Sequence, residues 1–278
     1  MAPKKNILIT GCSSGIGHDA ALTLNKKGWR VFATCRSRSD CKYFESLGIE
    51  SFPLDLSNEK SIKSATDLIE EKISSKLNAI FNNAAFAIPG AIQDLPRSAL
   101  REIFEVNVFG QFDLIKRCLP LMANAKDPRI VNCSSVLGFL SLPYRGAYSA
   151  TKFALEALTD AMRRENFDGP VKVILLKPGP VNTKIRQNSI KHFERWVNWQ
   201  DSIHEKKYKN VVIERLYNQS SSNLSKYELH PRSVTKVLEK ALDAKKPKCR
   251  YMITTPTLAA RILISTLPTK LLDWMFKI

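Results

Sequence analysis

Thr10-Gly11-Cys12-Ser13-Ser14-Gly15-Ile16-Gly17 separates the apolar run Ile7–Ile9 from a segment with helical spacing. Glycines between a strand and a helix let the backbone approach a pyrophosphate, and the helix start offers free N–H groups and a favourable dipole. A glycine triplet alone is a weak signal, but its place after a first strand and before a first helix is informative. The stretch predicts a dinucleotide-binding loop formed by Gly11, Ser13, Ser14, Gly15, Ile16 and Gly17.

On both sides of this loop, short apolar runs alternate with longer segments of helical spacing. Several runs are almost continuously apolar, which is typical of strands covered on both faces in a parallel sheet. The predicted strands are Asn6–Thr10, Arg30–Cys35, Glu50–Leu54, Ala79–Asn82, Arg129–Cys133, Val171–Leu176 and Arg250–Ile253. The predicted helices are Ile16–Lys27, Glu59–Ser74, Arg97–Met122, Tyr148–Phe167 and Arg232–Ala244. We therefore expect an α/β protein with a doubly wound parallel sheet.

No repeat, low-complexity tract or linker interrupts the pattern, so residues 1–278 are expected to form a single domain. Residues 184–231, here called the lid segment, carry many aromatic residues and lysines and show few clear elements. An insertion beyond the carboxyl end of a strand commonly forms the wall or lid of a binding site in such a sheet. A solvated surface excursion is the alternative at this stage.

The net charge of +17 suits nucleic acid, an anionic membrane surface or anionic small ligands. Without a long basic arm or a nucleic-acid motif, no nucleic-acid partner is expected. The 6 cysteines and 4 histidines show no metal-binding spacing, so no metal site is predicted. No signal peptide precedes the first apolar run, and no stretch reaches the roughly 18 apolar residues of a spanning helix. These features predict a cytoplasmic protein.

The end of the second predicted strand favours NADP(H). NAD enzymes usually place an acidic side chain there, which accepts hydrogen bonds from the ribose 2′-hydroxyl. This chain has Arg36 at that place and no carboxylate before Asp40. A guanidinium can pair with a 2′-phosphate through its planar donors, whereas Arg38 fits an ordinary surface position. Asp55 and Leu56, just after the third strand, are expected beside the adenine.

Tyr148 and Lys152 stand at positions i and i+4, on one face of a predicted helix. A free tyrosine has a pKa of about 10, and a nearby ammonium lowers it toward the range useful for acid–base chemistry. The tyrosine–lysine spacing alone is a common chance match. Ser135, at the tip of the preceding predicted strand, supplies a hydroxyl that could hold a substrate oxygen beside the tyrosine. The combination predicts proton transfer coupled to hydride transfer.

With these motifs in place, the chain resembles the short-chain dehydrogenase/reductase family, in particular NADP-dependent members that act on steroids, retinols and aldehydes. The resemblance runs from Asn6 to Thr183. It rests on the glycine loop at Thr10–Gly17, Asn82–Ala84, Asn107–Gly110, Ser135, the pair Tyr148 and Lys152, and Pro178–Thr183. It implies a Rossmann-like fold.

The resemblance also implies roles for individual residues. The implied catalytic tetrad is Asn107, Ser135, Tyr148 and Lys152, with Asn107 helping to hold a water that connects the lysine to solvent. Lys152 would bind the nicotinamide ribose. The further implied cofactor contacts are Asn83, Ala84, Tyr148, Val181 and Thr183. One departure is Ala85, where the family usually has glycine; a methyl group there is a modest steric change.

The resemblance suggests a lipophilic carbonyl or alcohol as the substrate, and a homodimer or homotetramer formed through the helices Arg97–Met122 and Tyr148–Phe167. The C-terminal tail, residues 257–278, combines apolar and basic residues. It could contact a membrane interface peripherally, or pack on the protein or on a second subunit. A non-catalytic dinucleotide sensor on the same fold is the competing function, although such a sensor would be expected to lose Tyr148 or Lys152.

Overall fold

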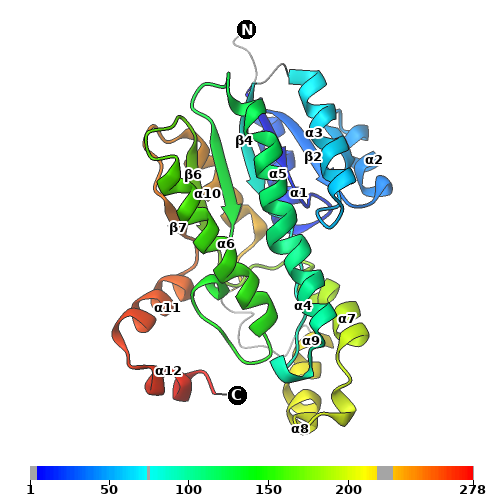
Figure 1. The fold of residues 1–278 in the computed structure, drawn as a ribbon, viewed down its shortest axis with the longest axis vertical. Helices are drawn as coiled ribbons and strands as arrows, with labels where there is room; N and C mark the ends of the chain where they lie inside the picture. The colour runs from blue at the N-terminus through cyan, green and yellow to red at the C-terminus, as the bar shows by residue number, and fades with distance from the viewer. Residues whose placement is uncertain (1–4, 74–75, 218–227, 278) are drawn as a thin grey trace.

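The computed structural model describes residues 5–73, 76–217 and 228–277 (Figure 1). Its centre is a parallel sheet with the strand order β3-β2-β1-β4-β5-β6-β7. The strands are β1 (Asn6–Ile9), β2 (Arg30–Cys35), β3 (Glu50–Pro53), β4 (Leu77–Asn82), β5 (Arg129–Cys133), β6 (Lys172–Lys177) and β7 (Arg250–Met252). The order reverses beside β1, so the carboxyl ends of β1 and β4 border a crevice. The doubly wound, Rossmann-like sheet is confirmed.

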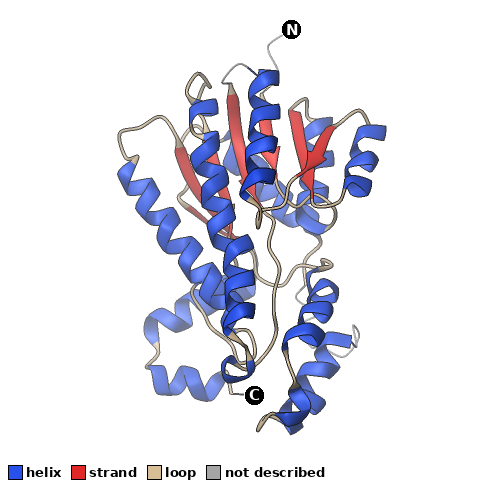
Figure 2. Ribbon diagram, turned by 45° about the vertical axis from the view of Figure 1, so that its right-hand side comes forward, coloured by secondary structure: helices blue, strands red, loops and turns tan. Residues whose placement is uncertain are grey.

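Helices cover both faces of the sheet (Figure 2). Successive side chains of a strand point to opposite faces, so Ile7 and Ile9 of β1 join one core cluster while Leu8 joins another. The helices α1 (Gly15–Lys26), α2 (Arg38–Ser46) and α10 (Pro231–Asp243) pack on the first face. The helices α3 (Glu59–Ile73), α5 (Gly110–Cys118) and α6 (Gly146–Glu165) pack on the second.

The predicted strands and most predicted helices are present, with ends shifted by a residue or two. Ser74, the expected end of α3, lies outside the described residues. Helix α2 was not predicted, because Cys41 and Phe44 are its only buried side chains and leave no clear apolar stripe. Its start is instead marked by Ser37, whose hydroxyl accepts a hydrogen bond from the Asp40 N–H at 3.2 Å.

The helix predicted over Arg97–Met122 is present, but it is not a uniform α-helix. The segment contains α4 (Arg97–Phe104), the π-helical turn η2 (Glu105–Phe109), α5, and the short 3₁₀ turn η3 (Pro120–Met122). The apolar spacing gives no sign of the π turn, in which Asn107 hydrogen-bonds Phe86 and Thr151 of two distant segments. Such turns inside α-helices often occur at functional sites.

The lid segment contains more regular structure than its sequence suggested. Its described part forms α7 (Ile185–Trp196), η5 (Trp199–Asp201), α8 (Glu205–Lys207), η6 (Tyr208–Val212) and α9 (Ile213–Tyr217); residues 218–227 lie outside the description. These helices lie beyond the carboxyl ends of the strands (Figure 1). Buried residues such as Phe193 and Tyr208 join a third core cluster with Phe86 and Tyr148. Tertiary burial therefore stabilises helices that local sequence leaves ambiguous.

The chain ends in two helices, α11 (Thr255–Thr266) and α12 (Thr269–Met275), with Pro268 between them. Both extend away from the sheet, and no side chain of α12 is buried (Figure 1). Ile278 lies outside the description. Among the described residues, no helix combines the length and apolar character that crossing a bilayer requires.

Candidate functional site

The glycine loop between β1 and α1 forms a cradle that added side chains would fill. Gly11 and Gly15 have φ angles of +71° and +62°, in the left-handed region that favours glycine. A Cβ on Gly17 would lie 2.4 Å from the carbonyl oxygen of Gly11. Ser14 caps α1 without a side-chain hydrogen bond, and the first turn holds no acidic residue. The uncapped N–H groups and the close backbone fit a dinucleotide pyrophosphate.

Polar side chains hold this loop against the end of β4. The Thr10 hydroxyl accepts hydrogen bonds from the N–H groups of Asn83 and Ala84, both at 3.0 Å. The Asn83 amide returns hydrogen bonds to the carbonyls of Thr10 and Gly11, at 3.0 and 3.3 Å. The structure therefore places Asn83 and Ala84 in the same cradle as the glycine loop. Ala85 is half-buried in the next position.

The segment after β6 closes the other side of the cradle. A Cβ on Gly15 would lie 3.0 Å from Cγ2 of Thr183, so this threonine borders the start of α1. Val181 packs against the core cluster that also contacts Ile16 and forms a parallel bridge with Leu229. The structure thus places Thr183 beside the glycine loop, and Ile16 and Val181 against the same core cluster.

At the end of β2, Arg36 is exposed, whereas the Arg38 guanidinium pairs with Glu45 at 2.6 Å. Arg36 lies near His192 of helix α7. Burial lowers the pKa of His192, and the positive charge of Arg36 adds to this lowering. Asp55 follows β3, the strand that pairs with β2, and accepts hydrogen bonds from the N–H and hydroxyl of Ser57 at 2.9 and 2.7 Å. Leu56 is buried, with its carbonyl against Gly110.

Tyr148, Lys152 and Ser135 meet at the carboxyl end of β5. The Lys152 ammonium, buried at 1% exposure, donates a hydrogen bond of 2.7 Å to the Cys133 carbonyl and lies 5.6 Å from the centroid of the Tyr148 ring. Ser135 begins the turn η4 (Val136–Gly138), and its hydroxyl oxygen accepts a hydrogen bond from the Leu137 N–H at 3.1 Å. Ser135 also lies close enough to the Tyr148 phenol to work against the burial that raises the pKa of that phenol. Three side chains from two elements therefore converge on one point.

Burial dominates the electrostatics of this group. Burial raises the pKa of Tyr148 and Cys133 adds to the rise, while Ser135 and Arg145 oppose it. The pKa of Tyr148 is therefore raised, whereas the sequence predicted that Lys152 would lower it. The reason is that loss of water destabilises the phenolate more than the neighbouring groups stabilise it. Burial also lowers the pKa of Lys152, against the charges of Cys133 and Glu156. Tyr148 is thus a protonated phenol at neutral pH.

Asn107 lies in the π turn and connects three segments. Its side-chain oxygen accepts the Phe86 N–H at 3.1 Å, and its amide donates to the Phe86 carbonyl at 2.9 Å and the Thr151 hydroxyl at 3.1 Å. Asn107 is fully buried. It ties the loop after β4 to helix α6, one residue from Lys152.

A family model described as short chain dehydrogenase matches residues 5–193. The chain belongs to the short-chain dehydrogenase family. It is 36% identical over 270 residues to an uncharacterized oxidoreductase, YbbO, of Escherichia coli, covering 97% of this chain and 93% of the relative. An NADPH-dependent 3-dehydrocapnine reductase of Ornithobacterium rhinotracheale is 31% identical over 280 residues, covering 97% and 95%. The rat (Rattus norvegicus) 17-beta-hydroxysteroid dehydrogenase type 6 is 33% identical over 282 residues, covering 99% and 88%. As a member of this family, the chain is an oxidoreductase that acts on CH–OH and C=O groups.

Sequence analysis missed several residues around the short-chain dehydrogenase site. Glu156, one turn after Lys152, bonds to Ser134 and to Lys177, and its i+4 spacing from Lys152 was the available signal. Arg145 lies near Tyr148, and burial lowers its pKa to about 10, with smaller contributions from Arg186 and Arg215. Nothing in the local sequence marks Arg145, since Arg186 and Arg215 come from the lid segment.

The cradle geometry predicts the effect of a single methyl group. Gly17→Ala places a Cβ against the Gly11 carbonyl, so the loop must open, which costs roughly 1–3 kcal/mol. We expect the Kd for NADPH, measured by fluorescence titration, to rise by about tenfold or more. Gly28→Ala is the control for general loss of stability: Gly28 follows the far end of the same helix with a φ of +87°, so alanine is strained there, but the added methyl group meets no part of the cradle. Unchanged NADPH affinity in Gly17→Ala would contradict the cradle.

Proposed function

We propose that the protein is an NADP(H)-dependent oxidoreductase that interconverts a carbonyl and an alcohol on lipophilic substrates. The observation that carries the proposal is the convergence of Ser135, Tyr148 and Lys152 beside the glycine cradle. The proposed cofactor residues are those of the cradle, together with Arg36, Asp55, Leu56, Val181 and Thr183. The family membership supports the reaction class.

A nicotinamide dinucleotide would supply or accept the hydride when bound. In the direction of reduction, the Tyr148 phenol gives its proton to the carbonyl oxygen, and the Ser135 hydroxyl hydrogen-bonds the same oxygen. The Lys152 ammonium stabilises the resulting phenolate and passes on a replacement proton, while Asn107 holds the surrounding loop. A phenol that burial keeps protonated is in the form that the direction of reduction requires. Each acid–base contribution is worth roughly 10²–10⁴-fold in rate.

The lid segment supports a lipophilic substrate. Tyr148 belongs to a cluster of apolar side chains that includes Phe86 and Leu137 from the strand ends, and Phe193 and Val212 from the lid segment. Such walls suit a substrate with a large apolar surface. The names of the 3-dehydrocapnine and hydroxysteroid relatives agree with this substrate class. We propose that residues 184–231 form the wall of the substrate site within a single domain.

Tyr148→Phe separates an enzyme from a dinucleotide sensor. Removing the phenol hydroxyl takes away the proton donor and leaves the cradle unchanged, so NADPH binding persists while turnover falls by about 10²-fold or more. The measurement is NADPH oxidation against a panel of aldehydes, ketones, and steroid and retinoid carbonyls. A wild-type chain that binds NADPH but oxidises it with no carbonyl would favour the sensor. Full activity in the variant would refute the role of Tyr148.

Preference for NADP(H) rests on Arg36, which is exposed at the end of β2, and agrees with the NADPH-dependent relative. Arg36→Ala removes the donors for a 2′-phosphate. Its KM for NADPH should rise by about tenfold or more, while its KM for NADH stays unchanged. Arg38→Ala is the matched control, because that guanidinium already pairs with Glu45. Equal effects on both cofactors would argue against a 2′-phosphate contact.

We propose further that the protein is a cytoplasmic homodimer or homotetramer that contacts membranes peripherally. Exposed Phe109 and Leu119, beside and after α5, and Phe153 and Leu158 of α6 support subunit contacts through these helices. The C-terminal tail exposes a second apolar set: Leu258, Ile262, Leu271, Trp274 and Met275. Its cations Arg261, Lys270 and Lys277 outnumber Asp273, which suits an anionic interface.

The tail proposal predicts binding to vesicles of anionic lipid. The full chain should sediment with phosphatidylglycerol vesicles more than with phosphatidylcholine vesicles. The double variant Ile262→Glu and Trp274→Glu should lower that binding by about tenfold or more, because two apolar side chains that would be buried in the lipid are replaced by charged ones. Ile203→Glu is the matched control, since Ile203 is 85% exposed but belongs to the lid segment. Binding that is equal for both lipids, or unaffected by the double variant, would remove the membrane interpretation.

A further inference from the structure

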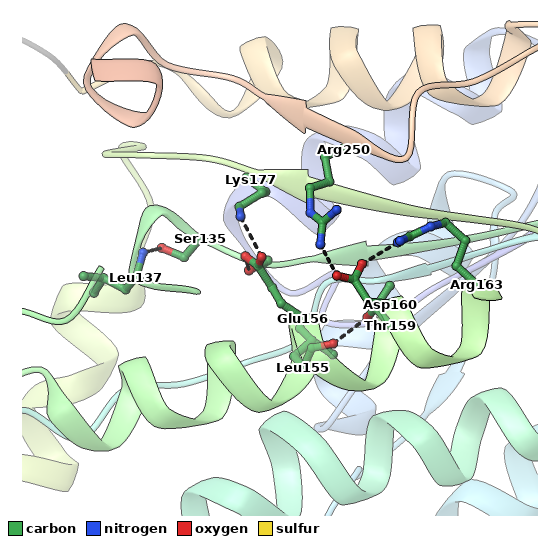
Figure 3. Close-up of polar contacts among 10 residues, drawn as sticks. Ser135, Leu137, Leu155, Glu156, Thr159, Asp160, Arg163, Lys177 and Arg250 are labelled. Atoms are coloured by element: carbon green, nitrogen blue, oxygen red, sulfur yellow. Dashed lines mark hydrogen bonds and ion pairs between the residues drawn. The ribbon is translucent and has the colours of Figure 1, made fainter. Parts of the chain in front are cut away.

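A buried ion pair lies beneath the turn that carries Ser135 (Figure 3). Glu156 of α6 accepts a hydrogen bond of 2.7 Å from the Ser134 hydroxyl through one carboxylate oxygen. Its other oxygen accepts a hydrogen bond of 2.6 Å from the ammonium of Lys177, at the end of β6. The pair thus connects α6, β6 and the residue that directly precedes Ser135.

The pair is buried, with side-chain exposures of 3% for Lys177 and 11% for Glu156. Removing two charges from water costs more than their attraction returns unless further hydrogen bonds satisfy them. Both oxygens of Glu156 are satisfied, and the Lys177 ammonium lies 4.2 Å from the centroid of the Phe139 ring. The free energy of folding alone does not explain such an ion pair, because apolar residues of similar size commonly give the same stability or more.

The pair lies beside a backbone segment that hydrogen bonds hold in place on each side of Ser135. The Ser134 N–H donates to the Leu176 carbonyl and the Val136 N–H donates to the Pro178 carbonyl, both at 2.8 Å. A Cβ on Gly138 would lie 2.3 Å from Oε1 of Glu156, so the turn after Ser135 rests directly on the carboxylate. The carboxylate therefore contacts the segment both before and after the serine.

We propose that Glu156 and Lys177 are positioning residues that hold the Ser135 turn in register with Tyr148 and Lys152. This proposal rests on the proposed carbonyl–alcohol chemistry of that site. Glu156 reaches the turn through its contacts with Ser134 and Gly138, while Lys177 holds the other oxygen of the carboxylate by an ion pair. A displacement of about 1 Å in such a turn can cost about a hundredfold in rate.

The principal test is Glu156→Gln in the full-length protein, which keeps the shape but removes the charge that pairs with Lys177. We expect kcat to fall by about tenfold or more while the KM for NADPH stays unchanged, because the glycine cradle is not involved. An unchanged kcat would overturn the proposal.

A pH profile of kcat adds a readout that loss of stability alone would not move. Three ionisable groups lie around Lys152: Cys133 of β5, and Tyr148 and Glu156 of α6. Burial lowers the pKa of Lys152, and the charge of Glu156 works against that lowering. Without this charge the lysine loses its proton at lower pH, so the alkaline limb should move to lower pH. An alkaline limb that stays in place or moves upward would count against the proposal.

Asp160→Asn is the matched control. Asp160 lies one turn further along α6 and forms ion pairs with Arg163 and with Arg250 of β7, farther from Ser135 (Figure 3). Its loss should lower the Tm but leave kcat and the alkaline limb at their wild-type values. If Asp160→Asn reproduced the kinetic defect of Glu156→Gln, the effect would be general destabilisation and the positioning role would be refuted.

Two further measurements separate this proposal from the proposed function. Hydrogen exchange by mass spectrometry over residues 134–140 needs no turnover; it should speed up in Glu156→Gln and not in Asp160→Asn. The double variant Glu156→Met and Lys177→Met, which replaces the pair with apolar side chains, should keep the fold but show the same loss of kcat. Wild-type kcat in the double variant would overturn the proposal. A wild-type protein without carbonyl reduction would refute the proposed function, whereas unchanged exchange would refute the positioning role alone.

Discussion

The buried ammonium of Lys152 constrains everything around it. A lysine with 1% exposure must find acceptors inside the protein, and the Cys133 carbonyl at the end of β5 supplies one at 2.7 Å. That hydrogen bond fixes the start of α6 against the sheet edge. Since Tyr148 lies one turn earlier on the same helix, it also fixes the phenol beside Ser135, which follows β5 directly. The spacing of a helix and the end of a strand thus place three reactive groups together.

The loops at the carboxyl edge of the sheet are held by polar side chains of neighbouring segments. Thr10 binds the backbone after β4, Asn107 binds both backbone groups of Phe86, and Glu156 binds the turn after β5. Each of these side chains satisfies buried polar groups that no strand or helix could pair. A parallel sheet leaves unpaired polar groups at its carboxyl edge. In this protein, hydrogen bonds to those groups hold the loops that border the proposed dinucleotide and substrate site.

Burial also sets the charge state of the site. It raises the pKa of Tyr148 and lowers that of Lys152, so the loss of water favours the neutral form of both groups. Glu156 adds a buried negative charge four residues after Lys152. The electrostatics of the site therefore depend on the same residues that hold its shape.

Local patterns in the sequence were enough to predict the seven strands, the glycine loop and the Tyr148–Lys152 spacing, because each depends on residues close together in the chain. Helix α2 could not be predicted because it has no clear apolar stripe. The π turn at Asn107 and the helices of the lid segment could not be predicted because they make their contacts with distant segments. The Glu156–Lys177 pair lies in this second group: a glutamate on a helix and a lysine at a strand end look like ordinary surface charges until the sheet buries both. Local propensity and spacing determined the elements and the candidate chemistry. Only tertiary packing decided which polar groups lost their water, and so which of them had to pair across the site.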